Sequence, residues 1–321
     1  MPASVTHAFF AKDLYDVLPE KIRANLDLDR LKMFGQSTDS LLFYNLYSRK
    51  SKKIRNLQKI SHTEHTQEFF LNLLRYIKDN NINDIDTYSF LVGFISHYVL
   101  DSVVHPYIFY KTGNFIKCDA STYKYNGIHH FMEVFLDNDM IKRRFKTNPY
   151  KFNISKFCFD TKCFSNDLSK TINYTFYNTF KVENISKIYY KSLKQMKTCI
   201  NLFRKDSYGF KRDFYKLIDT FTTKGTFRLE AISYYYSLKD IHNFLNSNHT
   251  LWRNPVIYNM TSNESFIDLY LKAIRIAKVI VCGSFDYLDG KNIDLEKIFT
   301  NNSYVTGLDC DLNKSMKYFA Y

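Results

Sequence analysis

One stretch of the sequence places three potential metal ligands at regular intervals. Asp101 follows His97 by four positions, and His105 follows Asp101 by four more. On a helix, four-residue steps advance about 40° around the axis and about 6 Å along it, so the three side chains form one ridge. A chain of this composition contains about 0.02 such His-x3-acid-x3-His triples by chance.

A single histidine on an apolar helix face is usually a core residue satisfied by one hydrogen bond. An acid bracketed by two imidazoles is different, because burying such a cluster without a cation costs free energy. The triple therefore predicts a divalent metal site.

A second element repeats the pairing of histidine and carboxylate. Glu133 follows His129 by four residues, a spacing that composition alone produces about 0.9 times in this chain. The pair gains weight because it follows the triple within 30 residues. His130 points about 100° away from His129 and is the weaker candidate. Asp137 either extends this ridge, is solvated, or supports a ligand from behind.

Two earlier segments and one histidine-rich helix start add further candidates. His7 stands at the start of an amphipathic segment, and Asp39 ends the turn Gly35-Gln-Ser-Thr-Asp39 before an apolar run. Asp39 alone would be interpreted as a helix N-cap. Of the two histidines at positions 62 and 65, we prefer His62 as a ligand and keep His65 in reserve.

Other catalytic signatures are absent from the sequence. It contains no HExxH, no ExxH pair, no His-Asp dipeptide, no GxSxG and no GxxxxGK[ST]. These absences exclude zincins, di-iron bundles, HD hydrolases, α/β-hydrolases and P-loop enzymes. The remaining prediction is a mixed histidine and carboxylate site that holds more than one ion, which suits zinc.

The elements that must position these ligands are predicted to be helices. The chain has 26 Tyr and 29 Phe but only 9 Gly and 5 Pro in 321 residues, a balance that favours packed helices. We expect an all-α single domain over residues 1–321, a multi-helix bundle around a buried multinuclear metal site, with the site within 1–140 and a helical part, 141–321, completing the fold. Residues 145–180 look irregular. Apolar periodicity predicts helices at about 7–18, 62–79, 84–105, 128–144, 184–204, 208–222, 228–246 and 262–281.

Charge and composition bound the partners and the compartment. The sequence begins without a signal peptide, which predicts a cytoplasmic protein, and no apolar stretch reaches the roughly 20 residues of a transmembrane helix. Six cysteines without a CxxC pair predict free thiols. A net charge of +13 favours anionic partners, either nucleic acid or an acidic membrane surface.

Together these motifs resemble the zinc-dependent phospholipase C family, which shares its helical fold and three-zinc site with single-strand-specific zinc nucleases. The resemblance covers residues 1–140, through the motifs around His7, Asp39, His62, the His97 triple and His129. Segments 248–255 and 303–310 look like parts of the bacterial, unsecreted branch of that family, without a catalytic pattern.

The resemblance implies a set of zinc ligands. One zinc would use Asp39, His62, His97 and Asp101, a second would use His105, His129 and Glu133, and a third would use His7 with Asp101 as a bridge. Secreted relatives complete the third site with an N-terminal tryptophan, but the only tryptophan here is Trp252. Removal of Met1 would free the amine of Pro2, which we consider as a replacement ligand.

The function implied is hydrolysis of a phosphodiester with two or three Zn²⁺ ions. Cations lower the pKa of a bound water and clamp phosphate oxygens, while Asp39 is the candidate catalytic residue that orients or deprotonates the water. The leading hypothesis is a phospholipase C-like phosphodiesterase acting on a phospholipid head group or a smaller phosphodiester. The alternatives are a nuclease for single-stranded nucleic acid and a non-catalytic, zinc-stabilised binding protein.

Overall fold

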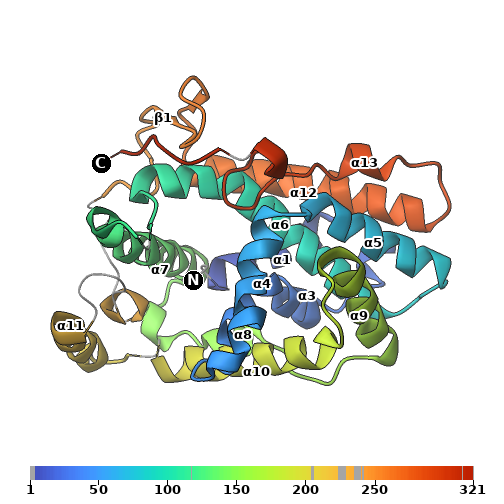
Figure 1. Cartoon of the computed structure of the whole chain (residues 1–321), viewed down its shortest axis with the longest axis horizontal. Helices are drawn as coiled ribbons and strands as arrows, with labels where there is room; N and C mark the ends of the chain where they lie inside the picture. The colour runs from blue at the N-terminus through green and yellow to red at the C-terminus, as the bar shows by residue number, and fades with distance from the viewer. Residues whose placement is uncertain are drawn as a thin grey trace.

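The computed structural model describes residues 4–116, 118–203, 206–222, 229–234, 240, 242–312 and 314–320. Helices form almost all of its regular structure, which confirms the all-α prediction (Figure 1). The strands described are β1 (Trp252–Arg253) and β2 (Thr261–Ser262), an antiparallel pair in which Trp252 lies opposite Ser262. All six cysteines are free, as predicted.

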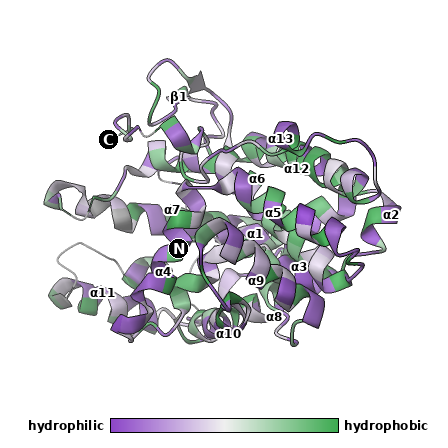
Figure 2. Ribbon diagram, turned by 45° about the vertical axis from the view of Figure 1, so that its right-hand side comes forward, coloured by the Kyte–Doolittle hydropathy of each residue, from purple (hydrophilic) through white to green (hydrophobic). Residues whose placement is uncertain are grey.

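Long helices alternate with short helical turns along the described chain. The α-helices are α1 (Ser4–Val17), α2 (Glu20–Arg23), α3 (Leu28–Phe34), α4 (Lys52–Thr63), α5 (Thr66–Asp79), α6 (Ile85–Thr112), α7 (Tyr123–Phe145), α8 (Ile154–Cys158), α9 (Asn166–Phe180), α10 (Ile185–Phe203), α11 (Phe210–Thr222), α12 (Phe266–Leu288) and α13 (Leu295–Ile298). The 3-10 turns are η1 (Ser37–Phe43), η2 (Arg49–Ser51), η3 (Ala120–Thr122), η4 (Pro149–Lys151), η5 (Leu229–Ile232) and η6 (Cys310–Leu312). Hydrophilic and hydrophobic residues alternate along most helices in Figure 2, as amphipathic packing requires.

Helix α6 forms the centre of the bundle. The N-cap residue of α6, Asp84, accepts a hydrogen bond from the N–H of Thr87. The C-cap residue is Gly113, whose φ is +76°. Helices α1, α3 and α12 pack against it. Within the described chain, α6 is the one helix long and apolar enough to cross a membrane by length and composition, but 83% of its most apolar window is buried in the bundle. Its uniform apolar character therefore fits a core helix that is covered on several sides.

Helix α6 continues past Pro106, where the sequence pattern predicted its end near residue 105. A proline has no N–H to donate, so the carbonyl of Ser102 loses its usual helical partner. Gly307 packs against this point with a φ of +65°, and a Cβ atom there would lie 2.4 Å from the Ser102 oxygen. The C-terminal segment thus approaches α6 closely where the proline interrupts its hydrogen bonds.

Gly93 allows the close contact between α6 and α3. A Cβ atom at this position would lie 2.6 Å from Phe34 Cβ and 3.0 Å from Gly35 N. We expect Gly93→Ala to lower the free energy of unfolding by about 1–3 kcal/mol, because both helices must separate to admit the methyl group. Urea denaturation measures this loss.

Gly283→Ala on α12 is the matched control for this substitution. It adds the same methyl group to a helix, but there it meets the flexible Cδ1 end of Ile298 at 2.6 Å. The higher helix propensity of alanine offsets part of the cost at either site. Equal stability of the two variants would show that Gly93 is not needed for the α3–α6 contact.

Two helix predictions and the prediction of an irregular region were wrong within the described residues. The predicted helix 62–79 is split into α4 and α5 because His65 takes the left-handed conformation, with a φ of +56°. The described part of 228–246 contains only η5. The region 145–180, predicted to be irregular, contains α8 and α9. In α9, Thr171, Thr175 and Thr179 are buried beside apolar residues, so counting apolar residues alone hid the helical period.

The buried side chains of residues 4–140 and of the later helices form one continuous hydrophobic cluster. Helix α12 packs along α6, and residues 303–307 reach the helices that carry the predicted ligands. Residues of the C-terminal part, which lies outside the sequence region that carries the motifs, therefore help to cover the candidate site.

Candidate metal centre

Four of the predicted ligands converge in the interior of the bundle. His62 Nε2 lies 3.2 Å from Asp39 Oδ1 and 3.3 Å from His97 Nε2. His97 Nε2 lies 3.1 Å from Asp101 Oδ2, and His62 Nε2 lies 3.8 Å from the same oxygen. Ligands bonded to a tetrahedral zinc at about 2.0–2.2 Å stand about 3.3–3.6 Å apart. The spacing of these four groups matches that requirement.

Three separate elements bring these ligands together. Asp39 lies in the first turn of η1, His62 lies in the last turn of α4, and His97 and Asp101 lie one turn apart on α6. All four side chains are at most 5% exposed. Helix α4 packs against η1, which places His62 opposite Asp39.

The orientation of the imidazole rings is fixed by oxygen atoms at Nδ1. His97 Nδ1 lies 2.9 Å from the carbonyl of Gly35, and His105 Nδ1 lies 2.8 Å from the carbonyl of Tyr304. His129 Nδ1 lies 3.2 Å from Thr112 Oγ1. His62 Nδ1 lies 3.4 Å from the hydroxyls of Thr38 and Ser61. Such contacts, with Nδ1–H donating, leave Nε2 as the free lone pair for a metal, an arrangement typical of metal-binding histidines.

A second group lies where α6 faces α7. Ligand atoms of His105, His129 and Glu133 lie within 4.8 Å of one another, and His129 Nε2 is 3.2 Å from Glu133 Oε1. The side chains of His105 and His129 are 13% and 16% exposed, whereas Glu133 is 4% exposed. A zinc with three protein ligands keeps a position open for water or substrate. The partial exposure fits that use.

His7 joins the first group through Asp101. His7 Nε2 lies 3.3 Å from Asp101 Oδ1, while Asp101 Oδ2 faces His97. The rings of His7 and His97 stack with centroids 4.2 Å apart. Asp101 therefore presents its two oxygens in different directions, as a carboxylate that bridges two cations must. The considered ligand Pro2 lies outside the described residues.

The charges of this cluster call for a cation. Asp39 Oδ2 and His7 Nδ1 are buried and have no hydrogen-bond partner among the described residues. Burial opposes the charged form of His97, but the carboxylates of Asp101 and Asp39 outweigh it and raise its pKa to about 9. Burial also opposes ionisation of Asp101, yet the charges of His105, His97 and His7 hold its pKa well below the usual range. Ionised carboxylates beside unpaired imidazole nitrogen fit the donor set of zinc.

Two neighbouring histidines, His65 and His130, are not members of these ligand groups. His65 is more than half exposed, and its Nδ1 lies 2.9 Å from Glu68 Oε2 on the surface. His130 Nδ1 lies 3.3 Å from Glu133 Oε2, behind the carboxylate rather than beside its ligand oxygen. Burial lowers the pKa of His130 to about 4, so it is neutral at physiological pH.

Asp137 anchors the helix that carries His7. Its buried carboxylate accepts hydrogen bonds from the N–H groups of Val5 and Thr6, at 3.2 and 2.7 Å, and from the hydroxyls of Thr6 and Tyr234. These contacts satisfy the free N–H groups at the start of α1 and place a negative charge at the positive end of its dipole. Asp137 thereby positions His7 from behind.

We expect Asp137→Asn to lower the free energy of unfolding by about 2 kcal/mol or more, because hydrogen bonds to a charged acceptor are lost. The zinc content should fall by the ion that His7 holds, as measured by elemental analysis. Asp139→Asn is the control, since Asp139 forms an i,i+4 ion pair with Arg143 on the same helix. Unchanged stability and zinc content in Asp137→Asn would contradict this role.

Sequence reasoning missed three residues that contact the ligands. Gln58 Nε2 donates a hydrogen bond to Asp39 Oδ1 at 2.8 Å. The Tyr304 ring lies 4.6 Å from that of His62, and the Tyr304 N–H donates to the His62 carbonyl at 2.9 Å. Ser303 Oγ donates to the same carbonyl at 3.2 Å. Segment 303–310 was noted only for its resemblance to relatives, and no spacing rule connects it to His62.

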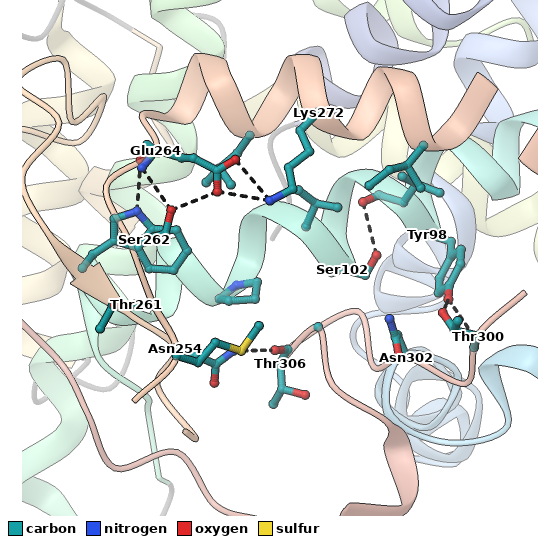
Figure 3. Close-up of a pocket in the computed structure, with 18 of the residues that line it drawn as sticks. Tyr98, Ser102, Asn254, Thr261, Ser262, Glu264, Lys272, Thr300, Asn302 and Thr306 are labelled. Carbon is teal, nitrogen blue, oxygen red and sulfur yellow. Dashed lines mark hydrogen bonds and ion pairs between the residues drawn. The ribbon is translucent and has the colours of Figure 1, made fainter. Parts of the chain in front are cut away.

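A separate cavity of about 390 Å³ lies on the other face of α6 (Figure 3). Tyr98 and Ser102 line it from α6, and an ion pair of Glu264 and Lys272 lies across it. On a helix these lining residues point about 100° or more away from His97. None of the candidate ligands lines this cavity, so it is not the metal centre.

Comparison with known families agrees with this geometry. The model of a family described as zinc-dependent phospholipase C matches residues 6–182, which is more than half of the chain and includes all eight candidate ligands. No curated protein and no solved structure matches the chain. The helical fold, the convergent histidine and carboxylate groups and this match agree, and the chain belongs to the zinc-dependent phospholipase C family.

Proposed function

We propose that this protein hydrolyses phosphoric diesters with two or three zinc ions held by His7, Asp39, His62, His97, Asp101, His105, His129 and Glu133. The observation that carries the proposal is the presence of two groups of candidate zinc ligands, one fully buried and one partly exposed to solvent. Asp39, His62, His97 and Asp101 are buried, whereas His105 and His129 are partly exposed. Family membership supports a phosphodiester as the substrate.

Zinc bound in such a site lowers the pKa of a water molecule and neutralises charge on phosphate oxygens. The chain's own residues orient the reactants. The burial of Asp39 opposes its ionisation, but the charges of His97 and His62 outweigh this and lower its pKa. An ionised Asp39 oxygen can accept a hydrogen bond from the attacking water and so aim its lone pair at phosphorus.

The side-chain amide of Gln58 binds one of the two carboxylate oxygens of Asp39. The amide donates to Oδ1 at 2.8 Å, whereas Oδ2 has no hydrogen-bond partner in the described part of the chain. Oδ1 is thus held in place by Gln58, and Oδ2 is available to a bound water molecule or ion. This division supports Asp39 as the residue that orients the water.

The substrate class is tested with a panel. We expect purified protein of known zinc content to hydrolyse a p-nitrophenyl phosphodiester and a short-chain phosphatidylcholine. Cleavage of single-stranded DNA with both of these untouched would favour a nuclease, a reading that the +13 net charge supports. Full zinc content without turnover of any diester would favour a zinc-stabilised binding protein.

A further inference from the structure

Helix α11 carries an exposed stripe of apolar side chains that contributes no residue to the candidate metal centre. Phe210, Phe214, Leu217 and Phe221 are 76%, 58%, 57% and 78% exposed. Their spacing of four, three and four residues puts them on one face of the helix. Large aromatic side chains gathered on an exposed helix face mark a site of interaction.

The other faces of α11 are fixed to the protein. Tyr215 is buried, and the Asp219 carboxylate accepts hydrogen bonds from the N–H groups of Leu229 and Glu230 at 2.9 Å each. At the start of the helix, Lys211 Nζ donates to the carbonyl of Leu202 at the end of α10, at 2.7 Å. The helix is therefore anchored while its aromatic stripe faces outward. Figure 1 shows α11 at the edge of the molecule, next to the end of α10.

The neighbouring helix α10 supplies positive charge. It contains four lysines and no acidic residue, and Lys187, Lys191 and Lys194 are exposed. Lys216 on α11 is also exposed. An apolar aromatic stripe accompanied by lysines on the same helix and on the preceding one is the pattern of a helix that lies in the interface of an anionic membrane.

A second exposed apolar area lies beside α10. Leu46 and Tyr47, which are 42% and 96% exposed, line a shallow groove of about 610 Å³ together with Leu202. The exposed basic residues that follow are Arg49, Lys50, Lys52 and Lys53. Apolar and basic side chains thus also occur together in this segment of the chain.

We propose that α11 is an interfacial helix that inserts Phe210, Phe214, Leu217 and Phe221 into the head-group region of an anionic lipid bilayer, while the α10 lysines contact lipid phosphates. A protein partner is less well matched, since lysine is depleted in the cores of protein interfaces. Such binding requires neither zinc nor turnover, so it can be tested separately from the proposed hydrolysis.

Vesicle sedimentation tests the proposal with the full-length protein. Wild type should bind phosphatidylglycerol vesicles and bind phosphatidylcholine vesicles more weakly, with added salt reducing the difference. The triple variant Phe210→Ser, Phe214→Ser, Phe221→Ser should bind phosphatidylglycerol vesicles at least about tenfold more weakly. Lys191→Glu with Lys194→Glu should remove the preference for anionic lipid while leaving α11 intact.

Val279→Ser is the matched control, because Val279 is 70% exposed on α12, a helix that Figure 1 shows far from α11. It should bind vesicles like the wild type. Undiminished binding by the triple variant, or no vesicle binding by the wild type, would overturn the proposal. Loss of self-association in the triple variant with unchanged vesicle binding would instead assign the stripe to contact between copies of the chain.

A soluble phosphodiester separates this proposal from the proposed function. The triple variant should hydrolyse it at the wild-type rate, since the stripe lies outside the metal centre. Vesicle binding by a protein that hydrolyses no diester would leave the interfacial helix standing and count against the hydrolase alone.

Discussion

Asp101→Asn will reduce phosphodiester hydrolysis by about a hundredfold or more and remove bound zinc. Asparagine has the same shape but only one oxygen and no charge, whereas Asp101 presents one oxygen to His7 and the other to His97. If Asp101 bridges two zinc ions as proposed, its replacement affects two ion sites at once. Metal ions contribute several kcal/mol of transition-state stabilisation, and about 1.4 kcal/mol corresponds to a tenfold change in rate.

Elemental analysis and initial rates on a p-nitrophenyl phosphodiester measure these two effects together. Asp79→Asn, an exposed acid near the end of α5, controls for the change of charge and should retain full zinc and activity. Circular dichroism checks that both variants are folded. Two or three zinc ions and wild-type turnover in Asp101→Asn would defeat the assignment of Asp101 as a bridge.

The part of the site on α6 was predictable because one helix carries it. His97, Asp101 and His105 are four residues apart, so helical geometry alone puts them on one ridge. In the structure, His97 and Asp101 belong to the buried ligand group, and His105 belongs to the partly exposed one. Long apolar periodicity also predicted α6 and α10 to within a few residues, apart from the extension of α6 through Pro106.

The rest of the site depends on packing between distant segments. Asp39 meets His62 only because α4 packs against η1, and the two are 23 positions apart with no helical register between them. The sequence offered no local reason to prefer His62 over His65. The structure separates them through the left-handed turn at His65, which ends α4 and directs that side chain to the surface.

Contacts made by the C-terminal segment could not be predicted from the sequence for the same reason. Tyr304 accepts a hydrogen bond from His105 through its carbonyl group, which any residue type could provide. Such a backbone contact leaves no signature in residue identity. Likewise, the buried threonines of α9 are polar by type, and only the neighbouring helices show that they lie in the core.

Removal of zinc should lower the melting temperature, and the size of the drop should depend on pH. In the metal-free protein the pKa of His97 is raised to about 9, so its protonation stabilises the fold below pH 6.5 and this contribution is lost as the pH rises through 9. The lowered pKa of Asp101 acts in the opposite direction. Its contribution is present above about pH 4 and is lost as the pH falls further.

Protons and zinc therefore compete for the same buried cluster. Near pH 6 the raised pKa of His97 stabilises the metal-free fold almost in full, whereas near pH 8 part of that stabilisation is lost and bound metal contributes relatively more. Zinc present at about 1,000 times its dissociation constant adds about 4 kcal/mol of stability. For a protein of this size we expect chelation at pH 8 to lower the melting temperature by about 10 °C.

Thermal denaturation before and after treatment with a chelator, at pH 6 and at pH 8, measures the difference. The drop should be larger at pH 8, and re-addition of zinc should restore the original melting temperature. In Asp101→Asn the chelator should have a smaller effect, because only an ion at His105, His129 and Glu133 would be left to remove. An equal drop at both pH values would mean that His97 does not exchange a proton for metal, and no drop after verified zinc removal would show that the ions do not stabilise the bundle.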